Sequence, residues 1–137
     1  MPRRPAQRCF EADCRKHLPT LKRLASGSEA EAKQILEMAP KNSAGLQQFL
    51  GKVAGNLACG HFPLTPECRH DFRKRRDEIY KVAQMDPSEQ SHYFQGSLRG
   101  ASLAKKLSGL TISALNCPYM KHVDYKPTKR DRLVTNT

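Results

Sequence analysis

The sequence contains no tryptophan, and aromatic residues make up only 7% of it. It also lacks long apolar runs, because none approaches the roughly 20 residues that a membrane-spanning helix needs. The stretch "MPRRPAQRCFEADC" at the N-terminus lacks the apolar segment of a secretory signal. We therefore expect no membrane span and an intracellular location.

Acidic residues are scarce as well. Thirteen Asp and Glu stand against 24 Lys and Arg, which gives a formal net charge of +11 over 137 residues. A chain of this length accommodates one domain with tails. Such an excess of positive charge favours a polyanionic partner, either nucleic acid or an anionic membrane surface. The membrane surface is the weaker option, because the few bulky apolar residues of the basic segment are needed for the core.

Motifs that would indicate catalysis are missing too. The sequence has no phosphate-binding glycine loop, no paired-carboxylate arrangement and no recognisable nucleophile-base-acid set. Its five cysteines are an odd number at irregular spacing, which indicates reduced thiols rather than a disulfide framework. We expect a protein that is not an enzyme, has no cofactor and contains no structural disulfide.

Apolar residues do recur at helical spacing, and no strand-like alternation of useful length interrupts them. Helix-start patterns occur at Ser28, at Thr65-Pro66 and at Asp86-Pro87. The predicted helices cover 18–26, 28–39, 43–60, 66–84 and a stretch that begins at residue 87 and has an undefined end. This pattern predicts an all-α fold, a small bundle of four to five short helices with flexible basic termini. We divide the chain into a basic N-terminal arm (1–17), a helical domain (18–110) and a basic C-terminal tail (111–137).

The positive charge is concentrated in three regions: the N-terminal arm, the segment "RHDFRKRR" and the C-terminal tail. On a continuous helix, Arg69, Arg73 and Arg76 share one face, away from Phe72 and Ile79. Such a face suits contact with phosphates, and no Asn or Gln beside the arginines offers base readout. The candidate phosphate-contacting residues are Arg3, Arg4, Arg69, Arg73, Lys74, Arg75, Arg76, Lys129, Arg130 and Arg132. Two other interpretations of "RKRR" are a solvated charged face and a nuclear import signal.

The stretch "LACGHFPLTPECRH" contains two cysteines and two histidines, which raises the question of a zinc site. Its ligand spacing is wrong for a zinc loop, and Cys68 and His70 diverge if a helix begins at Pro66. A site that combines Cys14, His17 and Cys59 with one residue of that pair stays geometrically open. A catalytic thiol at Cys59 beside His61 is a weaker alternative, because no third orienting group can be named. We interpret the stretch as a connector between two helices, with no metal bound.

The succession of "AKQILEMA", the elbow "GHFPLTP" and a Lys/Arg-rich helix resembles a known group of proteins. These are short, basic, helical proteins of unestablished activity encoded by Maverick (adintovirus-like) DNA elements. The resemblance covers about residues 18–83 and argues against a metal role at His61, Cys68 and His70. After Ala83 the sequence is less basic than the group's pattern. The resemblance implies a virion-associated or genome-packaging auxiliary protein rather than an enzyme.

These observations together predict a non-enzymatic, sequence-nonspecific nucleic-acid-binding protein with a structural or packaging role. DNA is the expected partner, and a nuclear or virion-associated location is expected. The alternative is a helical adaptor or structural protein that binds protein partners or itself, with the charge serving solubility.

Overall fold

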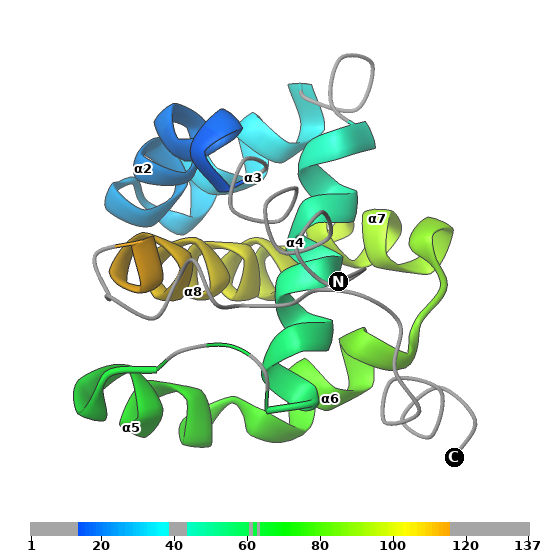
Figure 1. Ribbon diagram of the computed structural model, residues 1–137. Helices are drawn as coiled ribbons and strands as arrows, with labels where there is room; N and C mark the ends of the chain where they lie inside the picture. Colours follow the sequence, from blue (N-terminus) through cyan, green and yellow to red (C-terminus); the bar gives the residue numbers. More distant parts are fainter. Residues whose placement is uncertain (1–13, 39–43, 61, 63, 116–137) are drawn as a thin grey trace, which may run out of the picture.

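The structure is a computed structural model that describes residues 14–38, 44–60, 62 and 64–115 (Figure 1). This part of the chain is helical and has no strand, so the all-α prediction is confirmed. The helices are α2 (Leu18–Ser26), α3 (Glu29–Met38), α4 (Ala44–Ala58), α5 (Pro66–Lys74), α6 (Arg76–Gln84), α7 (Pro87–Gly96) and α8 (Leu98–Leu115). No helix in these described ranges combines the length and the apolar character that crossing a membrane requires.

Most of the helices begin where the sequence predicts. Ser28 and Glu31 form a capping box before α3: the Glu31 N–H donates to Ser28 Oγ at 3.1 Å, and the Ser28 N–H donates to Glu31 Oε1 at 2.8 Å. Asp86 and Glu89 repeat this arrangement at α7. Thr65 caps α5 through its Oγ1, which accepts a hydrogen bond of 3.2 Å from the third N–H of the helix. These contacts are local, so residue types at fixed spacing predict them.

The predicted helix over 66–84 is wrong as a single element, because it breaks at Arg75 into α5 and α6. The Arg75 N–H bonds to the carbonyl of Phe72 at 3.0 Å, three residues back, and its φ and ψ of −117° and 15° are not helical. The two halves pack against different partners. Ile79 and Val82 of α6 are fully buried, and α6 packs against α4, whereas α5 leans on α8 through polar contacts. The turn at Arg75 lets each half face its own partner.

The last predicted helix, which has no defined end in the sequence, ends as α7 at Gly96, and α8 begins after Ser97. Ser97 is extended, with φ −157° and ψ 161°, and α8 folds back against α7. Gly100 makes this approach possible, because a Cβ at this position would lie 1.6 Å from the carbonyl oxygen of Tyr93. The described residues thus contain the helices α2 to α8, and residues 14–16 are helical as well, so the predicted bundle of four to five helices is not confirmed.

Helix α8 is the centre of the core. It packs against α2, α3, α4 and α7, and it continues to Leu115, beyond the expected domain end at residue 110. The side chains around it include Phe49 and Phe94, both almost entirely buried. Cys14, from the expected N-terminal arm, is also buried in this core.

Helix α5 lies at the edge of the molecule and has no buried residue (Figure 1). Cys68 and Phe72 are partly buried against the core, and two polar contacts tie the helix to α8. Lys106 Nζ lies 3.6 Å from Asp71 Oδ2, and Arg75 Nη1 donates to Ser102 Oγ at 3.2 Å. One side of α5 is therefore fixed to the bundle while the other side faces solvent.

Candidate nucleic-acid interface

The solvent side of α5 carries four basic side chains. Arg69, His70, Arg73 and Lys74 are all exposed, and at 100° per residue they fall within an arc of about 140° around the helix. We call these four residues the α5 basic face. The residues on the opposite side of the helix, Cys68, Asp71, Phe72 and Arg75, are only partly exposed. The inward contacts of α5 thus determine which way its cations point.

No salt bridge to an acid of the described residues neutralises the α5 basic face. Within the part of the chain that the structure describes, Arg69, Arg73 and Lys74 form no salt bridge. The nearest acid on the inward side, Asp71, is directed to Lys106 of α8. Three permanently charged groups are therefore available to an anionic partner.

Arg75 behaves differently from the other predicted phosphate contacts. Its Nε and Nη2 donate to Glu78 Oε1 at 2.9 and 2.6 Å, and its Nη1 donates to Ser102. Its side chain is 22% exposed, and that of Glu78 is 12% exposed. All these contacts hold the guanidinium inside the fold, so the structure favours a positioning role for Arg75 rather than phosphate contact.

Glu78 links this position to two further helices. Its Oε2 accepts a hydrogen bond from the Tyr93 hydroxyl of α7 and lies 3.6 Å from Arg99 Nε of α8. Burial and, next to it, the hydrogen bond to the Glu78 carboxylate together raise the pKa of Tyr93 to about 12. The Tyr93 hydroxyl is thus a neutral donor across the physiological pH range. This network ties the α5–α6 turn to the rest of the bundle.

Arg76 is exposed at the first position of α6. The prediction of one helical face shared by Arg69, Arg73 and Arg76 is wrong in this respect, because the break at Arg75 puts Arg76 on a separate helix. Arg76 forms no salt bridge with the described residues and adds positive charge at the C-terminal end of α5. The predicted contacts in the two tails, Arg3, Arg4, Lys129, Arg130 and Arg132, lie outside the described residues.

A second group of cations belongs to the basic N-terminal region of the sequence and lies outside the predicted set of phosphate contacts. Arg15, Lys16, Lys22 and Arg23 are exposed on and just before α2, while Leu21 and Leu24 are fully buried. Helices α2 and α5 lie on either side of α8 in Figure 1. The signal for this group is the alternation of basic and apolar positions over 15–24, which resembles the pattern of α5.

The groove between α5 and α8, about 360 Å³ in volume, does not extend the α5 basic face. Its two lysines already have partners in the chain. Lys105 Nζ donates to the Gly27 carbonyl at 2.5 Å, and Lys106 faces Asp71. The available positive charge therefore lies on the outside of α5 rather than in this groove.

The alternatives raised by the Cys/His stretch find no support in the geometry. No group of three or more His, Cys, Asp or Glu side chains among the described residues could hold a metal ion. Cys68 packs against the core whereas His70 is exposed, so the two diverge as expected on a helix. Cys59 is almost fully buried, and His61 lies outside the described residues. No disulfide joins any two of the described cysteines Cys14, Cys59 and Cys68.

Comparison with known proteins does not identify the chain: no family model, no curated protein and no solved structure matches it. The resemblance to proteins of Maverick elements stays a prediction. The functional argument therefore depends on the chemistry of the α5 basic face.

Proposed function

We propose that this protein is a non-enzymatic nucleic-acid-binding protein that contacts the phosphates of DNA without reading its sequence. The observation that carries the proposal is the α5 basic face, with Arg69, Arg73 and Lys74 exposed and without acidic partners among the described residues. Phosphate contacts provide affinity and orientation but no direct sequence information.

The geometry of α5 suits a phosphate backbone better than base edges. Arg69 and Arg73 lie one helical turn apart, about 6 Å along the axis, so a strand that follows the helix meets both. The exposed side carries no Asn or Gln to pair with adenine. Because Glu78 and Ser102 hold Arg75 at the end of α5, the backbone of α5 has a fixed position from which its cations extend. Fixing them in advance lowers the entropy lost on binding.

The basic residues of the two tails add to the proposal as further phosphate contacts. Their positive charge would add to that of the α5 basic face and strengthen salt-sensitive binding. The resemblance to Maverick-encoded proteins supports a packaging role in a virion or in the nucleus. We include that role in the proposal, and we also propose that the protein acts inside the cell.

Binding measurements on the whole chain test the proposal. We expect equal affinity for three duplexes of unrelated sequence. If the three cations of the α5 basic face and Arg76 each meet a phosphate, affinity falls by about two orders of magnitude between about 50 and 200 mM salt. Binding that ignores salt, or that prefers one sequence by more than tenfold, would contradict the proposal.

A further inference from the structure

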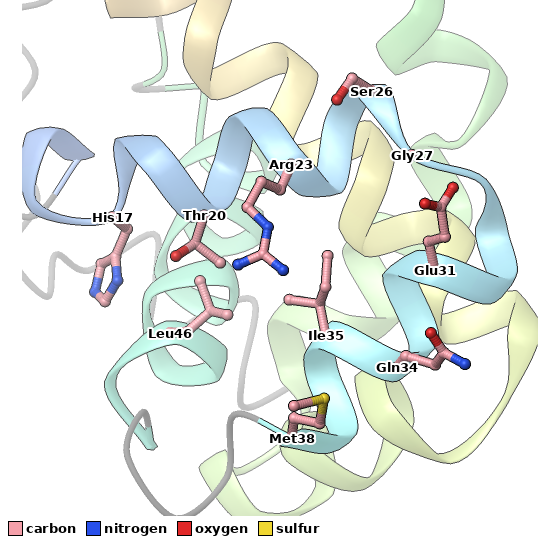
Figure 2. A pocket seen from close by; sticks show the side chains of 10 residues that line it. All are labelled: His17, Thr20, Arg23, Ser26, Gly27, Glu31, Gln34, Ile35, Met38 and Leu46. Carbon is pink, nitrogen blue, oxygen red and sulfur yellow. The ribbon is translucent and has the colours of Figure 1, made fainter.

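A second concave site lies on another part of the molecule, between α2, α3 and the start of α4. It has a volume of about 620 Å³, within the range of pockets that accommodate small ligands. Figure 2 shows Thr20 and Arg23 entering it from α2, Ile35 and Met38 from α3, and Leu46 from α4. We call it the α2–α3 bay. It shares no residue with the α5 basic face.

One side of the α2–α3 bay is aliphatic. Leu46 is buried and Ile35 is partly buried on this side of the bay. Met38 lies at the rim, and 80% of its surface is exposed. A methionine at a rim adapts its flexible thioether side chain to different apolar partners. Aliphatic side chains offer no hydrogen bond to a phosphate. Among the described residues that line the bay, His17 carries the one ring, and this ring packs against Phe49.

Arg23 supplies a cation beside this wall. Its guanidinium is directed into the bay, next to Thr20 and towards Ile35 (Figure 2). Among the described residues it forms no salt bridge. A guanidinium binds a carboxylate with two parallel hydrogen bonds, so this group fits a carboxylate ligand.

Glu31 makes the two ends of the bay differ in charge. It stands at the end next to Gly27, where its Oε1 accepts a hydrogen bond of 2.8 Å from the Ser28 N–H (Figure 2). That hydrogen bond lowers the pKa of Glu31, which therefore stays ionised. At the Gly27 end the charge of Glu31 is offset in part by Lys105, which donates to the Gly27 carbonyl, so this end offers an anion no free cation. Arg23 has no acidic partner among the described residues and is therefore the favoured position for a ligand's carboxylate.

We propose that the α2–α3 bay binds the C-terminal end of a partner protein that finishes in an aliphatic residue. The terminal carboxylate pairs with Arg23, and the aliphatic side chain packs against Ile35, Met38 and Leu46. A C-terminal leucine or methionine fits because a single residue carries both groups at short separation. The inference does not depend on nucleic-acid binding, and it gives the adaptor function a specific site.

The test is a two-dimensional NMR titration of the whole chain with N-acetyl-L-leucine, which carries both groups, with an acetamide in place of the preceding peptide bond. We expect saturable shifts of the backbone amides of Thr20, Gln34 and Ile35, with a dissociation constant of about 1 mM. N-acetyl-L-leucinamide, which lacks the charge, should bind at least about tenfold more weakly, as one charge-assisted hydrogen bond is worth that much.

Two variants locate the carboxylate. Arg23→Gln should weaken binding of N-acetyl-L-leucine by about the same factor as the amide probe does. Lys22→Gln removes the neighbouring exposed charge, which does not line the bay, and should leave the dissociation constant unchanged. Because both residues are exposed, the variants should fold, and the spectra themselves verify this.

Several results would overturn the proposal. These are equal binding of the amide, an unchanged constant in Arg23→Gln, and shifts that centre on α5 instead of the bay. Displacement of N-acetyl-L-leucine by a DNA duplex would assign Arg23 to the nucleic-acid surface and would overturn it too. Failure of DNA binding alone would leave this inference intact and refute only the proposed function.

Discussion

The carboxylate of Glu78 should contribute strongly to stability, because it is the shared partner of side chains from the α5–α6 turn, α7 and α8. Replacing it by alanine removes the partner of Arg75, a guanidinium that is only 22% exposed. It also removes the acceptor of the Tyr93 hydroxyl. The turn at Arg75 loses the contact that fixes its side chain, so both α5 and α6 are affected.

The size of the effect follows from how deeply this pair is buried. Exposed ion pairs contribute about 0–1 kcal/mol, and breaking a fully buried pair costs about 3–5 kcal/mol. The Arg75–Glu78 pair lies between these limits, and the lost acceptor of Tyr93 adds about 1 kcal/mol. We expect Glu78→Ala to lower the free energy of unfolding by about 2–3 kcal/mol, a large share of the total of a small domain.

Urea denaturation followed by circular dichroism measures this change. With a slope of about 1.5 kcal/mol per molar urea, the midpoint should fall by about 1.5 M. Asp77→Ala is the matched control, because Asp77 is the adjacent acid, is exposed and has no salt bridge among the described residues. It should change the free energy of unfolding by no more than about 0.5 kcal/mol. If the two variants are equally stable, the assigned role of Glu78 is wrong.

Two further predictions concern the junction of α7 and α8. Gly100→Ala places a Cβ 1.6 Å from the Tyr93 carbonyl oxygen. It should therefore lower the free energy of unfolding, measured by thermal denaturation, by about 3 kcal/mol or more. Gly96→Ala, which meets nothing within 4 Å, should differ from the wild type by about 1 kcal/mol at most; similar losses in both would contradict the close approach. The difference in ultraviolet absorbance between wild type and Tyr93→Phe should reveal a tyrosine with a pKa of about 12 rather than 10.0. Because the pKa of Tyr93 is higher in the folded protein than in the unfolded chain, the contribution of Tyr93 to stability is complete below pH 10 and is lost as the pH rises towards 12. A titration midpoint of Tyr93 near pH 10 would contradict the burial of its hydroxyl.

The sequence predicts the features of this fold that depend on neighbouring residues. The capping boxes at Ser28 and Asp86 and the cap at Thr65 are set by two residue types three positions apart. The exposure of Arg69 and Arg73 follows from the apolar residues on the other side of the helix. Both kinds of feature need only a short window of sequence.

Features that depend on packing between distant segments were not predictable. Helical propensity continues through Arg75, and only the different positions of α4 and α8 explain the break there. The inward turn of Arg75 depends on Ser102, 27 residues away. The α2–α3 bay joins residues of three helices, so no single motif marks it. The basic positions of α2, by contrast, follow a periodic pattern that a short stretch of sequence contains.

The salt dependence of DNA binding by an α5 variant tests the central claim most directly. Each phosphate contact contributes about 0.9 to the slope of the logarithm of the binding constant against the logarithm of salt concentration. Arg69→Gln/Arg73→Gln should therefore give a slope shallower by about 2 than that of the wild type. Lys33→Gln/Lys81→Gln, which removes the same charge from α3 and α6, should keep the wild-type slope. If all three proteins have equal slopes, Arg69 and Arg73 do not contact phosphates and the account is contradicted.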